Sequence, residues 1–259
     1  MSPTRVIKLE ELRSHCQKCS LIKLCLPMGL EEGDLNKLDS IIQRRRGLEK
    51  SDYLYRIGEP FSCVYAIRTG SLKTYTTNQD GLEQIISFHL PGELIGMEAI
   101  SGEVHTCSAQ ALESTSVCEI PFDRLETLST QIPGLQHHLF TLMSEEMQHD
   151  HCHLSILAKS NVESRLANFL VELSTRFSDR GFSATEFNLS MSRNDIANVL
   201  GMAVETISRL FTQLQEQGIL NVERKSIKIL NLDALQALSN KCTPEPNPSS
   251  QNSSQSSSS

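Results

Sequence analysis

The sequence predicts an α+β protein in which an antiparallel β-roll comes first, a long helix follows, and a winged helix-turn-helix completes the folded part. Three observations predict this order. Short β-like runs alternate with turn signals over residues 30–132. Apolar residues then recur at intervals of three and four over residues 133–159. Finally, residues 160–242 contain two short amphipathic helices around a glycine, and a hairpin follows them.

Length and composition indicate an ordinary globular protein. The chain has 259 residues, of which 39% are hydrophobic and 21% charged, and its net charge is −7. The negative charge argues against a protein that coats nucleic acid by bulk electrostatics. No apolar run approaches the roughly 18 residues of a membrane span, and the charged N-terminus does not look like a secretory signal. We therefore expect a cytoplasmic protein with reduced cysteines and no membrane partner.

The N-terminal segment, residues 1–29, holds a cluster of cysteines. The stretch HCQKCSLIKLC spaces Cys16, Cys19 and Cys25 as C-x2-C-x5-C. Three thiols are incomplete, because tetrahedral zinc and iron–sulfur sites usually take four protein ligands. Spacing alone does not choose the fourth among the remaining cysteines, which are Cys63, Cys107, Cys118, Cys152 and Cys242.

The β-roll is predicted over residues 30–132 from strands at regular spacing. The runs VYAIR, SLKTYTT, EQIISFHL and SVCEI are each followed by a turn signal, namely Thr-Gly, Asn-Gln-Asp-Gly, Pro-Gly and Pro. Several short strands separated by such signals are typical of a β-sandwich or a barrel-like roll. We therefore expect an antiparallel β-roll over these residues.

The segment 133–159 predicts one long helix with a narrow apolar stripe. The 3,4 spacing of this stripe is that of a coiled-coil seam, and polar residues flank it. The stripe consists of Phe140, Met143, Met147, Asp150, Leu154 and Leu157. We expect a homodimer joined along these residues. A helix that packs only on its own domain is the alternative.

Asp150 places a carboxylate inside this seam. In a symmetric dimer it would face its twin, and two like charges about 4 Å apart repel by about 1 kcal/mol in water and about 4 kcal/mol at an effective dielectric constant of 20. Such repulsion would keep dimerisation marginal, whereas at a wet rim it would matter little. On the flank of the stripe, His149 and His153 are spaced to bind a metal ion, although a solvated polar face fits them better.

The helix-turn-helix is predicted over residues 189–220, LSMSRNDIANVLGMAVETISRLFTQLQEQGIL. Ser192 and Asp195 form a capping box for the first helix, and Gly201 supplies the turn. The second helix buries an apolar stripe that includes Ile207 and Leu214. The following stretch, ILNVERKSIKIL, predicts a hairpin that adds a basic wing.

The exposed side of the second helix carries Glu205, Ser208 and Arg209 near its N-terminal end. In this motif that end meets base edges in the major groove. Arginine can bind guanine in bidentate fashion, glutamate can accept from cytosine and serine can contact thymine, although a solvated Glu–Arg pair is the alternative. Residues 192–228 carry a net charge of only +1. Tight binding to double-stranded DNA should therefore need two half-sites and hence a dimer.

Residues 243–259, TPEPNPSSQNSSQSSSS, have almost no apolar content. Such a segment buries too little surface to offset the entropy of ordering. We expect a disordered tail.

Taken together, these parts resemble the CRP–FNR superfamily of bacterial transcription regulators, whose β-roll is of the cyclic-nucleotide-binding type. The cyclic-AMP branch holds the nucleotide phosphate with an arginine just before a Ser-Ala pair, and Cys107 occupies that slot here. A cyclic nucleotide is therefore not expected. The FNR-type oxygen sensors (fumarate and nitrate reduction regulators) match in the cysteine spacing, in QALESTSVCEIPF and in VETISR.

The resemblance implies that Cys118 is the fourth ligand and that Cys16, Cys19, Cys25 and Cys118 hold a [4Fe-4S] cluster. It implies an oxygen-responsive regulator that dimerises under anaerobic conditions, binds inverted repeats with half-sites close to TTGAT, and activates or represses anaerobic genes. RNA polymerase would be contacted through the turn at Gly70, the turn at Gly81 and the segment 180–187. Leu82 and Lys18 depart from residues that members of the family can carry at these places.

Two other readings stay open from the residues alone. Structural zinc could occupy the cysteines of a DNA-binding protein with another effector. An iron–sulfur electron carrier or redox enzyme is the other alternative. That reading leaves the helix-turn-helix unexplained, and the sequence shows no second cysteine cluster, dinucleotide fingerprint or catalytic arrangement. We therefore expect a regulator and not an enzyme.

Overall fold

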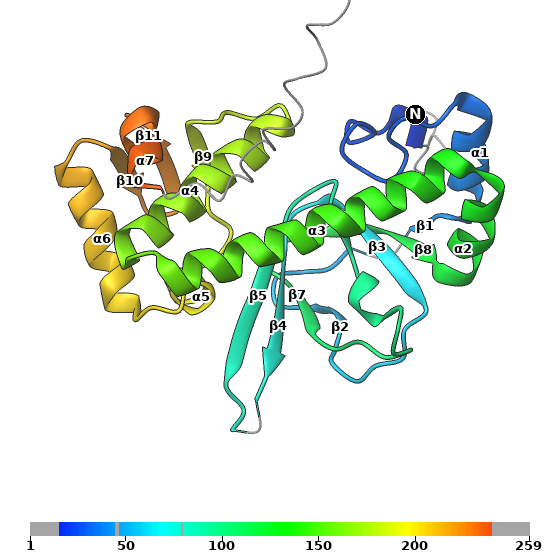
Figure 1. Cartoon of the computed structure of the whole chain (residues 1–259), viewed down its shortest axis with the longest axis horizontal. Coiled ribbons are helices and arrows are strands. Elements are labelled where there is room, and N and C mark those ends of the chain that lie inside the picture. Colours follow the sequence, from blue (N-terminus) through cyan, green and yellow to red (C-terminus); the bar gives the residue numbers. More distant parts are fainter. Residues whose placement is uncertain (1–15, 45–46, 79, 240–259) are drawn as a thin grey trace, which may run out of the picture.

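The computed structural model describes residues 16–44, 47–78 and 80–239 (Figure 1). Cys242 and the predicted tail, residues 243–259, lie outside the described residues. The β-roll, the long helix α3 (Pro133–Lys159) and the helix-turn-helix follow one another as expected, with α3 running across the molecule between the two ends (Figure 1). Among the helices described, none combines the length and apolar character needed to cross a membrane.

The β-roll consists of two antiparallel four-stranded sheets. Their strand orders are β1-β8-β3-β6 and β2-β7-β4-β5. The strands are β1 (Gln43–Arg44), β2 (Tyr53–Tyr55), β3 (Cys63–Thr69), β4 (Leu72–Thr77), β5 (Glu83–His89), β6 (Leu94–Ile95), β7 (Ser108–Ala111) and β8 (Ser116–Pro121). The inner faces of both sheets enclose one core, to which Tyr55, Ile67 and Val117 belong.

Strand β3 is apolar along most of its length because both of its faces are covered. Tyr65 and Ile67 point into the inner core, and Val64 and Ala66 point into a second core outside the sheet. We call this the outer core. It is closed by Leu26 and by the helices α1 (Glu32–Ile41), α2 (Phe122–Gln131) and the start of α3. A single 3-10 turn, η2 (Cys16–Lys18), begins the described chain, and another, η3 (Met97–Ala99), follows β6.

The long helix α3 contributes to two different surfaces. Pro133 occupies its first turn, where the missing N–H costs nothing. Leu135 is fully buried in the outer core, and Leu139 and Leu142 pack against that core from the next turns. The N-terminal cysteine segment and the beginning of α3 therefore share one hydrophobic cluster.

The C-terminal half is a winged helix-turn-helix. Its elements are α4 (Val162–Asp179), β9 (Glu186–Asn188), α5 (Arg193–Val199), α6 (Val204–Glu216), β10 (Leu220–Glu223), β11 (Ser226–Ile229) and α7 (Leu232–Leu238). The capping box between Ser192 and Asp195 is present, and Gly201 takes a positive φ of 62° in the turn. The sheet order is β10-β11-β9, so β9 adds a third strand that the sequence did not predict.

This half also packs on the β-roll of the same chain. One hydrophobic cluster joins Ile85 and Phe88 of β5 to Phe169 of α4 and Ile196 of α5. Polar contacts accompany it, because the Ile85 N–H donates to Asn198 Oδ1 over 2.6 Å. The orientation of the helix-turn-helix is therefore fixed by contacts with the β-roll as well as by α3.

Candidate metal centre and nucleic-acid interface

The three N-terminal cysteines lie in a run of tight turns. The Cys19 N–H donates to the Cys16 carbonyl over 3.0 Å, and the Met28 N–H donates to the Cys25 carbonyl over 2.9 Å. The Cys16 N–H donates to Asp39 Oδ1 over 2.9 Å. This last bond ties the beginning of the segment to α1, so the thiols are held on a folded loop over the outer core.

Cys118 reaches the same place from β8. Its strand pairs with β3, and the register sets Cys118 opposite Ala66. Because side chains alternate along a strand, Cys118 shares a face with Ile120, which is fully buried in the outer core. Cys25 and Cys118 both pack against this core and are half-buried.

Electrostatic effects between the thiols indicate how near they are to one another. The pKa of Cys25 is raised to about 12, mainly by burial, with smaller contributions from the charges of Cys118 and Cys19 that act against a lowering by the backbone N–H of Leu26. Burial also raises the pKa of Cys16 far above its usual range, with further contributions from Asp39, Cys25 and Cys118. The structure thus places Cys16, Cys25 and Cys118 near enough to influence one another, with Cys19 near Cys25, in a setting that disfavours the thiolates of Cys16 and Cys25 unless a positive group joins them.

The donor set fits an iron–sulfur cluster. Four thiolates, one on each iron, are the usual ligands of a [4Fe-4S] cluster. Because each thiolate binds a different iron, the four cysteine sulfurs lie further apart than the sulfurs that surround a single metal ion. Within residues 16–44, 47–78 and 80–239, no three His, Cys, Asp or Glu side chains are arranged as ligands of one metal ion. The other described cysteines, Cys63, Cys107 and Cys152, come from β3, from the residue before β7 and from α3.

The predicted seam lies on an open face of α3. The side chains of Phe140, Met147 and Leu154 are 62%, 60% and 63% exposed, which is unusual for large apolar residues on one helix face. Met143 and Asp150 are exposed as well, and Leu157 is half-buried. The residues of α3 that pack on its own domain are different ones. The described part of the chain therefore leaves Phe140, Met147 and Leu154 largely uncovered, while Met143, Met147 and Asp150 also line a cavity against the β-roll.

Most polar residues on the flank of α3 are exposed, but His149 and His153 are half-buried, which differs from the solvated face expected for these two residues. The His149 Nε2 donates to Glu172 Oε1 of α4 over 2.9 Å, and both side chains are only a little over one third exposed. This hydrogen bond raises the pKa of His149. His153 is half-buried beside the backbone of Val199 in α5. The two histidines join α3 to the DNA-binding half instead of forming a metal site.

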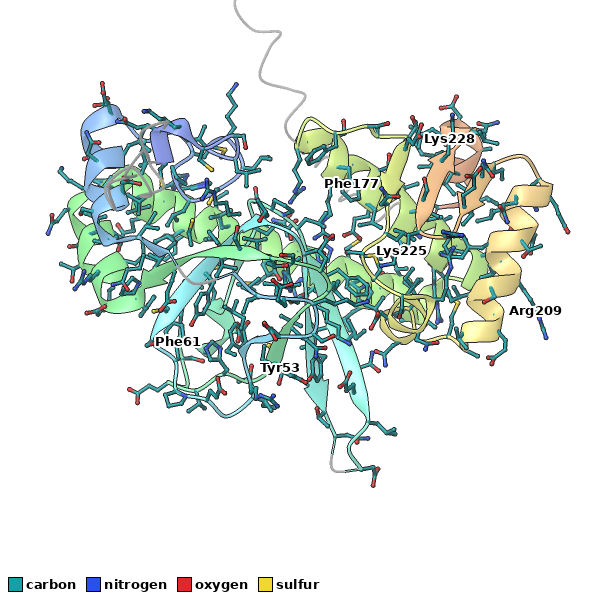
Figure 2. All side chains as sticks on the ribbon, turned by 180° about the vertical axis from the view of Figure 1, so that it is seen from behind. Tyr53, Phe61, Phe177, Arg209, Lys225 and Lys228 are labelled. Atoms are coloured by element: carbon teal, nitrogen blue, oxygen red, sulfur yellow. The ribbon has the colours of Figure 1, made fainter. Side chains whose placement is uncertain are left out.

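The second helix of the helix-turn-helix, α6, presents Glu205, Ser208 and Arg209 to solvent as predicted from its periodicity. The Arg209 side chain projects outward from α6, and Lys225 and Lys228 belong to the neighbouring wing (Figure 2). The Ser208 hydroxyl donates to the Val204 carbonyl over 2.9 Å, which leaves its oxygen free to accept.

A cavity of about 390 Å³ lies between the β-roll and α3, and no sequence pattern predicts it. Its described lining contains no Arg or Lys side chain. Carboxylates contribute instead, among them Glu98 and Asp150. The Cys107 thiol lies 3.6 Å from Glu98 Oε1, and burial raises its pKa to about 12. An anionic phosphate would meet repulsion here.

The segment 180–187, the expected polymerase contact, begins with a buried side chain and continues with mostly exposed residues. The Arg180 side chain is only 5% exposed and is bonded to Glu93. Phe182 is 61% exposed, so only the later part of the segment is accessible. Arg180, Arg176 and Glu93 were missed by sequence reasoning, since their partners are more than 80 residues apart in the chain.

Comparisons with known proteins agree with this architecture. The chain matches the cyclic nucleotide-binding domain over residues 45–131 and the Crp-like helix-turn-helix domain over residues 164–238. It is 49% identical over 233 residues to the transcriptional activator protein anr of Pseudomonas aeruginosa, which covers 90% of this chain and 96% of that protein.

Two further relatives cover most of the chain. The fumarate and nitrate reduction regulatory protein of Vibrio cholerae is 49% identical over 217 residues, 84% of this chain and 87% of that protein. The structure of FixK2 from Bradyrhizobium japonicum superposes with a TM-score of 0.72 at 31% identity, over 78% of this chain and 100% of that one. Identity and coverage at this level show common family membership. The chain belongs to the FNR-type branch of the CRP–FNR superfamily, whose members are DNA-binding transcription regulators and not enzymes.

Proposed function

We propose that this regulator responds to oxygen through a [4Fe-4S] cluster bound by Cys16, Cys19, Cys25 and Cys118. The observation that carries the proposal is the convergence of four thiols from two distant parts of the chain on one side of the outer core. When bound, the cluster would supply a group that oxygen attacks and breaks down.

The outer core links these cysteines to the dimer helix. Leu26, next to Cys25, is fully buried in the same cluster as Leu135 of α3. A cluster would hold the segment through its three cysteines and would be anchored to β8 through Cys118, so it would also hold the first turns of α3. Release of the cysteines removes this restraint and leaves the N-terminal segment attached mainly through its apolar side chains.

Dimerisation would then occur along the exposed seam of α3, defined by Phe140, Met143, Met147, Asp150, Leu154 and Leu157. A second copy of the chain would bury these apolar side chains, and the paired Asp150 carboxylates would oppose it. Association that is close to balance can be shifted by a few kcal/mol of restraint elsewhere. The seam therefore suits a dimer that forms only when the N-terminal segment is held.

The dimer would read an inverted repeat with half-sites close to TTGAT. Glu205, Ser208 and Arg209 of each α6 would contact bases, with the two helices about 34–36 Å apart. The bound protein would activate or repress anaerobic genes. Contact with RNA polymerase is proposed for the β-roll turns at Gly70 and Gly81 and for the segment 180–187, in which Phe182 is 61% exposed. The cavity between the β-roll and α3 has no Arg or Lys side chain in its described lining. This supports the proposal that the regulator is not controlled by a cyclic nucleotide.

The test is the content of iron, acid-labile sulfide and zinc per chain in protein purified without oxygen. About four irons and four sulfides per chain, with absorbance that bleaches in air, would support the proposal. Zinc without sulfide, and no change in air, would contradict it and leave a DNA-binding regulator with a structural metal.

A further inference from the structure

The turn Pro91–Glu93, between β5 and β6, is covered on one side by the cysteine segment. Gly92 has a positive φ of 94°, and a Cβ placed on it would lie 3.1 Å from the Cβ of Leu24. Leu24 immediately precedes Cys25 and is half-buried. The turn is also tied to β3, because the Gly92 N–H donates to the Ile67 carbonyl over 2.8 Å.

On its other side the same turn holds the DNA-binding half. The Arg176 Nη2 donates to Glu93 Oε2 over 2.7 Å, and its Nε donates to Oε1 over 3.1 Å. The Arg180 Nη2 donates to Glu93 Oε1 over 2.5 Å, and the Arg180 Nε donates to the Pro91 carbonyl over 2.7 Å. Two arginines of α4 therefore clamp one carboxylate of the β-roll in a charge-assisted arrangement.

Arg176 extends this clamp to the dimer helix. Its Nη1 donates to Glu172 Oε1 over 3.1 Å, and Glu172 accepts from His149 of α3. His149 is the neighbour of Asp150 in the seam. One guanidinium thus lies where the β-roll turn, α4 and α3 meet.

The clamp is well placed to respond as a unit. The side chains of Arg180, Arg176 and Glu93 are 5%, 18% and 26% exposed. Removing one partner from such a group leaves a charge that water solvates poorly, so the remaining contacts are weakened together. Helix α4 shares one hydrophobic cluster with α5 and α6, so a change in its position changes where α6 stands.

We infer that Glu93 is a positioning residue that transmits the state of the cysteine segment to the DNA-binding half of the same protomer. Leu24 holds the turn while the segment is in place, and Glu93 passes that restraint to Arg176 and Arg180. This inference rests on the proposed function, because it needs a segment that is held in one state and released in the other. It adds a route within one chain to the route through dimerisation.

Amide hydrogen exchange on the full-length protein, in the cluster-bound state and after exposure to air, tests the inference. In the wild type, exchange should increase in air in residues 16–30, 88–95 and 172–182. In Glu93→Gln, amide exchange in residues 16–30 and 88–95 should still increase in air. Exchange in residues 172–182 should be equally fast in the cluster-bound and the aerated states. The ratio of DNA affinities between the two states should fall by about tenfold.

Glu83→Gln is the matched control. Glu83 lies on β5, and its carboxylate pairs with Lys73 of the neighbouring strand over 3.5 Å, so the variant loses the same charge without removing the contacts between Glu93 and α4. It should behave like the wild type. A second variant, Leu24→Ala, loosens the turn from the other side and should uncouple residues 172–182 while iron content is retained.

Two results would overturn the inference. In the first, residues 172–182 of Glu93→Gln respond to air as they do in the wild type. In the second, residues 172–182 of the wild type do not respond to air, although the protein contains iron before aeration and loses it afterwards. Protein without iron and sulfide would instead contradict the proposed function itself, so the two failures are distinguishable. A purely structural role for Glu93 would accelerate exchange in both states and leave the response intact, which also counts against the inference.

Discussion

Cys118 is the residue whose role depends most on the fold, because only strand register brings it to the N-terminal cysteines. Cys118→Ser should abolish the binding of about four irons per chain and should remove oxygen-regulated DNA binding. A hydroxyl is a poor ligand for a soft iron–sulfur site, and three thiols cannot complete it. Iron and sulfide analysis together with DNA-binding assays in both states would measure this.

The matched change is Cys152→Ser, which alters a half-buried cysteine on α3. That variant should retain iron, sulfide and the response to air. If Cys118→Ser kept full cluster content, or if Cys152→Ser lost it, the ligand assignment would be wrong.

Variants of Arg209 and Lys225 should distinguish recognition of DNA bases from contact with the DNA phosphate backbone. Arg209→Ala removes a group suited to guanine and should weaken binding to the specific site by about 1–3 kcal/mol, with relaxed preference at one base pair. Lys225→Ala, at the tip of the wing, should weaken binding to all sequences alike and lower the salt dependence. Fluorescence titrations with specific and scrambled duplexes, repeated at several salt concentrations, would distinguish the two patterns.

Single residues were predictable where the information is local. Glu205, Ser208 and Arg209 follow from one helix period, and Ser192 with Asp195 from one helix start. Spacing could not select Cys118, which resemblance supplied, because its approach to Cys16 and Cys25 depends on the pairing of β8 with β3. The cluster of Glu93, Arg176 and Arg180 was missed for the same reason, since its members come from separate elements and have no motif.

At the scale of elements, α3 should be the part that decides dimerisation. Asp150→Ala removes the like charges that would face each other in the seam, which should strengthen dimerisation by at least about 1 kcal/mol, or about fivefold. The variant should therefore bind DNA in air.

Glu145→Ala serves as its control, because Glu145 is an exposed carboxylate of α3 outside the seam. Sedimentation of both variants in air, with DNA binding measured in parallel, would test the difference. Equal behaviour of the two variants would mean that charge at Asp150 does not limit dimerisation.

The contact between α3 and α4 should make stability depend on pH through His149. Its hydrogen bond with Glu172 raises the pKa of His149, so the stabilisation is fully present below the unfolded pKa of about 6.5 and is lost as pH rises through the raised value. Burial opposes ionisation of Glu172, but the hydrogen bond from His149 and the charge of Arg176 lower its pKa, so its contribution is lost only in acid.

The difference in unfolding free energy between wild type and His149→Gln should therefore be largest near pH 5–6 and should shrink above that range. Because both side chains are more than one third exposed, the maximum should be below about 1 kcal/mol. Denaturant titrations at several pH values would measure it. A difference that grows as pH rises would contradict the assignment.

Long periodic elements were predictable and short ones were not. Helix α3 and the two helices of the helix-turn-helix, α5 and α6, have repeated apolar spacing. Strand β9 has three residues, Glu186–Asn188, and only Phe187 of them is buried. It exists because β11 offers a partner edge, which no local pattern in its own sequence reveals.

At the scale of the whole molecule, one helix-turn-helix should bind one DNA half-site only weakly. Tight binding to DNA should therefore require a dimer. The region of residues 192–228 carries a net charge of only +1, so one half-site offers little non-specific attraction. A duplex with both half-sites should bind the anaerobic protein at least about a hundredfold more tightly than a duplex with one. Comparable affinity for the two duplexes in a gel-shift titration would count against binding as a dimer.

The open face of α3 has a chemical consequence for a protein that meets oxygen. A monomer leaves Met143 and Met147 exposed, at 39% and 60%. Oxidants convert such thioethers to sulfoxides, which are polar and no longer suit an apolar seam. Peroxide formed during prolonged aeration would transfer one oxygen atom to each sulfur and leave water, and the resulting sulfoxides would persist after the oxygen is removed. Recovery of the dimer would then depend on repair of methionine as well as on the cysteines.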